Sequence, residues 1–98
     1  MTFEIEHGNT TNITVAGKLD FANAPSLMEA LSELKGKDIS KIVFNCEELS
    51  YISSAGIRVI VFAKQKLSPD MEVVISKASN EVIEILEICG IIDIIDIV

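Results

Sequence analysis

Hydrophobic and polar positions alternate in two short segments at the start of the chain. In FEIEH the two glutamates separate Phe3, Ile5 and His7. In NITVAG the polar Thr14 lies between two apolar residues. A period of two residues is typical of a strand with one buried face. The polar stretch GNTTN supplies a turn between them, so the sequence predicts an opening β-hairpin.

Two later segments have the spacing of amphipathic helices. Between residues 24 and 34 leucines recur every three or four positions, Pro25 suits the first turn, and Gly36 ends the run. Residues 55–66 follow with a heavily apolar face. Each pattern predicts a helix that packs its apolar side against the rest of the protein.

A third helix is predicted after Ser79, whose hydroxyl can cap it. Its glutamates are expected to face outward, and Gly90 stands where a helix C-terminus favours a residue that tolerates positive φ. The predicted inward stripe consists of Val82, Ile85, Leu86 and Cys89.

The remaining apolar runs predict strands. Residues 41–46, KIVFNC, indicate a central strand covered on both faces. Residues 71–76 predict a strand after a turn at 68–70, and 91–98 a short closing strand. Strands joined through helices run parallel, whereas hairpin strands are antiparallel. We therefore expect an α/β fold, a mixed β-sheet of four to five strands with helices packed on it, in a single domain over residues 1–98.

Composition and charge narrow the possible partners. The chain of 98 residues is 49% hydrophobic, which predicts a packed domain, and its net charge is −7. No basic residue follows Lys77. Nucleic acid and anionic membrane surfaces, which need lysine and arginine patches, are therefore not expected partners. The apolar runs are too short for a membrane span, so no direct membrane insertion is expected.

The cysteines and the single histidine do not indicate catalysis or metal binding. Cys46 and Cys89 lie in apolar surroundings without CxxC spacing, and the first residues do not resemble a signal peptide. We expect two buried, reduced thiols in a cytoplasmic protein. His7 is the only candidate base and lies on an alternating strand, and these three residues are too far apart to suggest zinc. No enzyme activity, metal or cofactor is expected.

The stretch LSYISSAGIRV places Ser53 and Ser54 directly before the predicted helix of residues 55–66. Serine is a preferred N-cap, and a helix N-terminus favours an oxygen or an anion. Neither serine has a Glu or Gln three residues later, and Gly56 in the first turn costs about 1 kcal/mol relative to alanine. Such a glycine suggests close approach by another backbone or by a partner. Plain capping and a modifiable or contact serine both remain open.

These residues resemble the STAS domains of bacterial anti-sigma factor antagonists. YISSAGIRVIV is similar to the signature segment in which a serine or threonine at a helix N-terminus is phosphorylated. VAGKLDFANAPSLMEAL and SNEVIEILEICGIIDIIDI are similar to the family's second strand with its first helix and to its last helix and strand. Matched by position, Ser54 is the acceptor, Ser53 replaces the usual acidic residue, and Asn45 stands where many members carry an acid.

The resemblance implies partner switching. The unmodified protein would bind an anti-sigma factor that is itself an ATP-dependent serine kinase, phosphorylation of Ser54 would release it, and a phosphatase could reset it. Ser53 is the alternative acceptor. The implied partner-binding residues are Asp20, Ser53, Ser54, Ala55, Gly56, Ile57 and Arg58. A non-phosphorylated STAS module, acting as a transporter accessory or a scaffold subunit of a sensory complex, is the alternative function.

Overall fold

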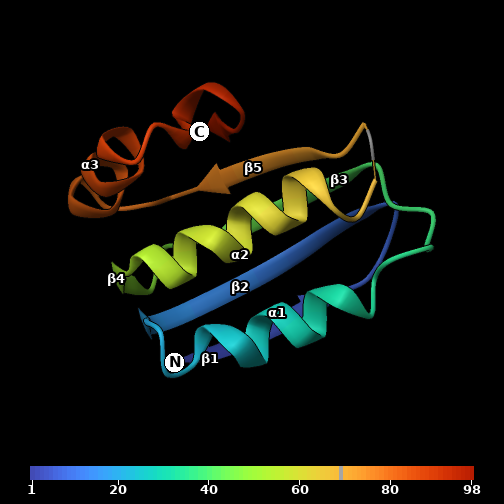
Figure 1. The fold of residues 1–98 in the computed structure, drawn as a ribbon, viewed down its shortest axis with the longest axis horizontal. Coiled ribbons are helices and arrows are strands. Elements are labelled where there is room, and N and C mark those ends of the chain that lie inside the picture. The colour runs from blue at the N-terminus through green and yellow to red at the C-terminus, as the bar shows by residue number, and fades with distance from the viewer. Residues whose placement is uncertain (69) are drawn as a thin grey trace.

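The computed structural model describes residues 1–68 and 70–98. Its elements, in chain order, are β1 (Thr2–Glu6), β2 (Thr10–Leu19), α1 (Ala24–Ser32), β3 (Lys41–Asn45), β4 (Leu49–Ile52), α2 (Ser54–Gln65), β5 (Glu72–Ser76), α3 (Asn80–Ile88), the 3-10 helix η1 (Ile91–Asp93) and β6 (Asp96–Ile97). In Figure 1, α1 and α2 lie in front of the sheet, and α3 lies near one corner. The turn predicted at residues 68–70 includes Pro69, which lies outside the described residues.

The strands form a mixed sheet in the order β1-β2-β3-β5-β6. β1 and β2 are antiparallel, with Phe3 opposite Val15 and Ile5 opposite Ile13. The neighbours β2 and β3, β3 and β5, and β5 and β6 are parallel, and each connection passes through a helix. The predicted hairpin, the mixed sheet and the central position of β3 are therefore confirmed.

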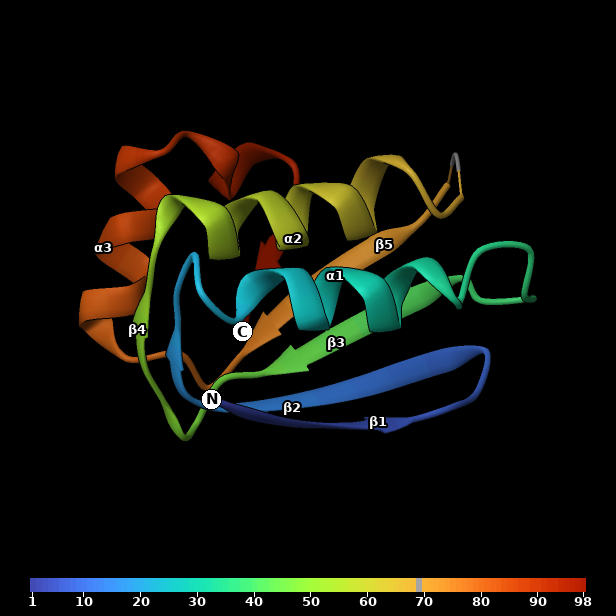
Figure 2. The same ribbon diagram turned by 60° about the horizontal axis from the view of Figure 1, so that its bottom comes forward.

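The helices cover only one face of this sheet (Figure 2). Ile42 and Phe44 of β3 point to the covered face and are fully buried, whereas Val43 is only half-buried. Within residues 1–68 and 70–98 no element packs on the other face, so the prediction that β3 is covered on both faces is wrong. Val43 lies opposite Val74 of β5 in the middle of the sheet, where neighbouring strands shield an apolar side chain without a second layer.

Strand β4 was not predicted, and it raises the sheet to six strands from the expected four to five. It pairs in parallel with the last residues of β2, and the register shifts between Gly17 and Lys18, where Ser50 has no partner. Such a bulge breaks the two-residue alternation by which strands are recognised. Gly17 has a φ of 87°, a backbone conformation that glycine adopts without steric cost.

Both ends of α3 lie where the sequence predicted them, but its buried face differs from the predicted one. The Ser79 hydroxyl accepts a hydrogen bond from the Val82 N–H (3.2 Å), and Gly90 has a φ of 74°. Val82 and Leu86 are buried, but Cys89 is exposed. The predictions that Cys89 faces inward and is buried are wrong, because α3 ends at Ile88 and the chain turns at Gly90.

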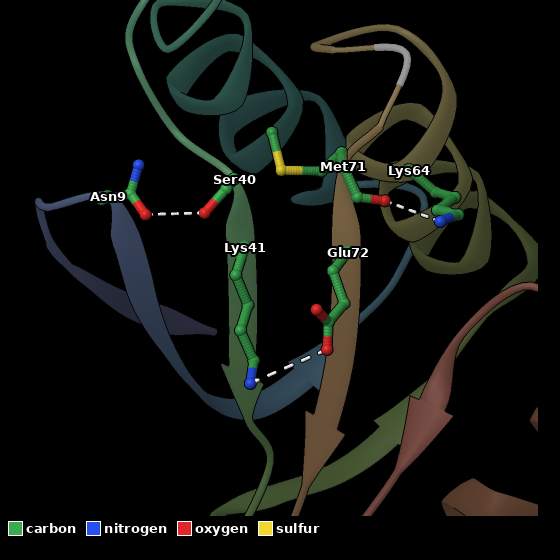
Figure 3. Close-up of polar contacts among 6 residues, drawn as sticks. All are labelled: Asn9, Ser40, Lys41, Lys64, Met71 and Glu72. Atoms are coloured by element: carbon green, nitrogen blue, oxygen red, sulfur yellow. Dashed lines mark hydrogen bonds and ion pairs between the residues drawn. The ribbon is translucent and has the colours of Figure 1, made fainter.

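At the end where β3 and β5 begin, polar side chains are satisfied by nearby groups (Figure 3). The Ser40 hydroxyl donates to Asn9 Oδ1 (2.6 Å), and Lys64 Nζ, near the end of α2, donates to the Met71 carbonyl oxygen (2.6 Å). Lys41 and Glu72 form an ion pair between adjacent strands (3.7 Å). These contacts join α2, β3 and β5 at one end of the molecule.

None of the helices in the part of the chain that the structure describes has the length and apolar character needed to cross a membrane.

Candidate functional site

Ser53 lies at the junction between β4 and α2 and acts as the N-cap of the helix. Its backbone is extended (φ −94°, ψ 175°), and its hydroxyl oxygen accepts a hydrogen bond from the Gly56 N–H at 3.3 Å. Its own N–H donates to the Leu19 carbonyl oxygen at 2.9 Å. Ser53 is therefore held by both its backbone and its side chain, as plain capping requires.

Ser54 is the first residue of α2, and its side chain is exposed. Its hydroxyl makes no hydrogen bond with any residue in 1–68 or 70–98. The positive end of the helix dipole lies at this position, which favours added negative charge. The two adjacent serines thus differ: one hydroxyl is used by the fold, and the other is open to a partner or a modifying enzyme.

Two of the expected contact residues point into the protein. Gly56 is buried, and a Cβ atom placed on it would lie 2.7 Å from Ile52 Cγ1 and 2.8 Å from Leu19 Cγ. The close approach suggested by this glycine is therefore internal, between α2 and the ends of β4 and β2. Ile57 is 6% exposed and belongs to the core. Gly56 and Ile57 therefore pack the first turn of α2 against the protein interior and are not exposed to a partner.

Asp20 shapes the loop that follows β2. Its carboxylate accepts hydrogen bonds from the N–H groups of Ala22 (3.1 Å) and Asn23 (3.2 Å). Asn23 in turn accepts from the Asp20 N–H (2.9 Å) and donates to the Lys18 carbonyl oxygen (2.8 Å). Each of these side chains makes the local bonds typical of an ordered turn.

The ends of β2 and β4 bring this loop beside the serines. Leu19 pairs with Ile52, so Asp20 and Ser53 are the next residues on adjacent strands. Figure 2 shows both strands turning up at the same end of the molecule, β2 toward α1 and β4 toward α2. Residues about thirty positions apart in the chain thus form one surface, with Asp20 half-buried within it.

A groove of about 350 Å³ lies between α1 and α2 on this surface. Among the described residues that line it, Arg58 alone is charged, and it is exposed. Phe21, in the Asp20 loop, is 81% exposed at the groove. The full lining is Phe21, Ala24, Pro25, Met28, Ala55, Arg58 and Val59.

The sequence predictions did not include Phe21, Pro25 or Met28 among the site residues. A large aromatic residue beside a turn-forming aspartate was the available signal for Phe21. Pro25 and Met28 were assigned to the first helix, where their positions fit helical spacing. Their place on the groove depends on how α1 packs against α2.

In the part of the chain that the structure describes, the metal-ligating groups are dispersed, and the buried thiol is that of Cys46. Within 1–68 and 70–98, no three His, Cys, Asp or Glu side chains come together as a metal site. Burial raises the pKa of the Cys46 thiol to about 12, so it is protonated at neutral pH. At this end of the molecule the hydroxyl of Ser54 and the guanidinium of Arg58 are both exposed.

Residues 4–98 match the family model of the STAS domain. The chain belongs to the STAS domain family. No curated protein sequence matches this STAS domain. The family assignment therefore rests on the match over almost the whole chain.

Solved structures share the fold of this STAS domain at low sequence identity. An anti-sigma factor antagonist from Mycobacterium paratuberculosis has a TM-score of 0.86 at 16% identity, covering 98% of this chain and 83% of that one. The Bacillus cell fate determinant SpoIIAA in its phosphorylated form has a TM-score of 0.77 at 18% identity, with 99% and 91% covered. A sulfate transporter family protein from Wolinella succinogenes has a TM-score of 0.73 at 13% identity, with 95% and 80% covered.

Proposed function

We propose that this STAS domain is an anti-sigma factor antagonist that acts by partner switching. In its unmodified form it binds an anti-sigma factor with ATP-dependent serine kinase activity, and phosphorylation of Ser54 releases it. The observation that carries the proposal is the exposed, unbonded hydroxyl of Ser54 at the first residue of α2. The likeness to an anti-sigma factor antagonist and to phosphorylated SpoIIAA supports it.

Accessibility favours Ser54 over Ser53 as the acceptor. The Ser53 hydroxyl accepts the Gly56 N–H and is half-buried. A kinase acting on Ser53 would have to disrupt the N-cap, which costs about 1 kcal/mol in a typical helix. Modification of Ser54 leaves this hydrogen bond in place.

A phosphate on Ser54 can be accommodated without unfolding the domain. It adds a charge of about −1.5 to −2 at the positive end of α2, where anions are favourable. Arg58 is four residues further along the helix, a spacing at which side chains of opposite charge pair. The phosphate would draw this guanidinium toward itself and add bulk and negative charge to the surface that the partner contacts.

The test is phosphorylation by a candidate anti-sigma kinase, either purified or in a lysate of the source cells. Intact mass and site mapping follow incubation with ATP, for wild type, Ser54→Ala and Ser53→Ala. We expect one phosphate on wild type and on Ser53→Ala, and none on Ser54→Ala. Modification that persists in Ser54→Ala and disappears in Ser53→Ala would transfer the acceptor role to Ser53.

Partner binding gives the second half of the test. Ser54→Ala should bind the anti-sigma factor as wild type does, and Ser54→Asp at least about tenfold more weakly, a loss of about 1.4 kcal/mol. Both variants leave the Ser53 cap in place, so circular dichroism should be unchanged. Equal binding by all three proteins would remove Ser54 from the mechanism.

A binding module without phosphorylation is the second candidate, as an accessory of a transport system or a scaffold subunit. It is favoured by the likeness to the Wolinella sulfate transporter family protein. On this proposal the protein gains no mass with ATP and lysate, although a control kinase substrate in the same lysate does. A stable complex with a transporter or a sensory protein, equally tight for wild type and Ser54→Asp, would then identify this role.

A further inference from the structure

The groove between α1 and α2 combines an apolar lining with one cation. Ala24, Pro25 and Met28 come from α1, and Ala55 and Val59 from α2. Its volume of about 350 Å³ is at the small end of the range for ligand pockets, about 300–1,000 Å³. A groove of this size suits one or two large side chains of a protein partner.

We propose that this groove binds a partner segment that presents a leucine-sized apolar side chain next to a carboxylate. The apolar side chain packs between α1 and α2 under Phe21, and the carboxylate pairs with Arg58. This inference rests on the proposed function, because Ala55 and Arg58 follow Ser54 on α2 and belong to the same surface.

Phe21 is placed for such a role by the loop that carries it. The hydrogen bonds between Asp20 and Asn23 order the turn on both sides of Phe21, while the ring itself is 81% exposed. Because the backbone on both sides of Phe21 is already ordered, a partner that covers the ring need not order this loop when it binds. Aromatic and arginine side chains are also the residues that most often dominate binding energy.

The exposed guanidinium of Arg58 favours a carboxylate as its partner. Arg58 is the only arginine in a chain of net charge −7. Among the described residues the ion pairs are Lys41 with Glu72 and Lys77 with Glu47, so Arg58 is in neither. Its guanidinium is available for a two-pronged contact with a carboxylate. A phosphate on Ser54 would compete for the same group, which links this contact to release of the partner.

A second copy of this chain is the competing occupant. On α3, Ile88 is 84% exposed, with Glu84 and Glu87 nearby in the helix, so the protein itself carries an apolar side chain beside carboxylates. Contact between α3 of one copy and the groove of another would be head-to-tail, and such contacts build rings or open chains. Self-association is therefore one outcome that the experiment must separate.

The test uses four blocked dipeptides as probes of the whole, unmodified protein: leucyl-aspartate, leucyl-asparagine, alanyl-aspartate and alanyl-asparagine. Each is titrated into ¹⁵N-labelled protein, and amide shifts are followed for wild type, Arg58→Gln and Phe21→Ala. Lys66→Gln, an exposed cation at the other end of α2, is the control for charge, and Tyr51→Ala, a half-exposed aromatic, is the control for Phe21.

We expect leucyl-aspartate to bind with a Kd of about 1 mM and to shift amides along the groove. Leucyl-asparagine should bind about threefold to fivefold more weakly, as for one exposed charge-assisted contact. Arg58→Gln should abolish this preference, Phe21→Ala should weaken both leucine peptides, and the two controls should behave as wild type. The alanine peptides should bind too weakly to saturate.

Equal affinity of wild type for leucyl-aspartate and leucyl-asparagine, or shifts confined to the open face of the sheet, would overturn the proposal. So would self-association of wild type in sedimentation velocity that Phe21→Ala abolishes, because the occupant would then be a second copy. The titration needs neither kinase nor ATP. A negative result here therefore leaves phosphorylation of Ser54 intact, and failure of phosphorylation leaves a positive titration intact.

Discussion

The two ends of the sheet differ in how many of their polar side chains are bonded within the protein. At the Lys64 end, which comprises Asn9, Ser40, Lys41, Lys64, Met71 and Glu72, side chains bond to one another or to nearby backbone (Figure 3). At the Ser54 end, which comprises Asp20, Phe21, Ser53, Ser54, Gly56 and Arg58, Asp20 and Ser53 hold the backbone in place. The hydroxyl of Ser54, the guanidinium of Arg58 and the ring of Phe21 remain exposed.

This difference separates residues that maintain the fold from residues that are available for recognition. A bonded side chain contributes to stability, and its replacement is measured in the unfolding transition. An exposed and unbonded side chain contributes little to stability, so its replacement is measured in binding or modification.

The largest expected difference is in the reactivity of the two thiols. Cys46, at the end of β3, is buried with a pKa of about 12, whereas Cys89 is exposed. With that pKa, the Cys46 thiolate fraction is about a thousandfold lower than for an unperturbed thiol. Iodoacetamide at pH 8 should therefore add one group, at Cys89, as measured by intact mass. Rapid alkylation of Cys46 would show that the structure beneath the Ser54 end opens.

The same thiol predicts a loss of stability in alkaline solution. The ordinary pKa of this thiol, which applies in the unfolded chain, is 9.0, but burial raises the pKa to about 12 in the folded protein. Between these values the unfolded state binds fewer protons, so the free energy of unfolding falls as the pH rises. Urea unfolding of Cys46→Ala should show a shallower decline over this range than wild type. Parallel declines would contradict the burial of the thiol.

Gly56→Ala should destabilise the protein by about 1–3 kcal/mol through overpacking. The added methyl group would lie within 3 Å of Ile52 and Leu19, which outweighs the gain of about 1 kcal/mol in helix propensity. Urea unfolding measures the change, with Gln65→Ala, exposed on the same helix, as the control. A more stable Gly56→Ala protein would mean that α2 is not seated against β2 and β4.

Ser53→Ala and Ser54→Ala should differ although the residues are adjacent. Loss of the Ser53 cap should lower the free energy of unfolding by about 1 kcal/mol. Ser54→Ala should change it by less than about 0.5 kcal/mol, since its exposed hydroxyl is not bonded within the described residues. Thermal and urea unfolding of the two variants test the assignment, and a larger effect at Ser54 would reverse the roles given to the two serines.

The smallest expected effect is at the Lys64 end. Glu72→Gln removes the ion pair with Lys41. The side chain of Lys41 is 38% exposed and that of Glu72 is 53% exposed. An exposed pair of this kind is worth about 0–0.5 kcal/mol, and the difference from wild type should vanish in high salt. A loss above about 1 kcal/mol in urea unfolding would show that this pair contributes more to stability than an exposed ion pair does.

Local sequence patterns were sufficient for most of the elements. The hairpin alternation, the leucine spacing of α1, the Ser79 cap and the Gly90 turn each involve residues close together in the chain, where the backbone preferences act directly. The residues around Ser54 also carried the resemblance to STAS domains, and the family match confirms that membership.

The features of the fold that the sequence did not predict depend on contacts between residues that are distant in the chain. The bulge opposite Gly17 hides the period of β4, and whether Val43 has a layer above it depends on which sheet face the helices cover. Cys89 is exposed because the chain turns at Gly90 before another element can cover it. In each case a local pattern is compatible with two environments, and packing selects one.

The site shows the same division. The order of residues alone indicated two serines at a helix start, because capping and the helix dipole act over one turn. It did not indicate which serine caps, or that Phe21 and Met28 share a groove with Arg58. Those relations arise only when β2 and β4 pair and α1 lies against α2, since burial and hydrogen bonding are settled by neighbours in space rather than in the chain.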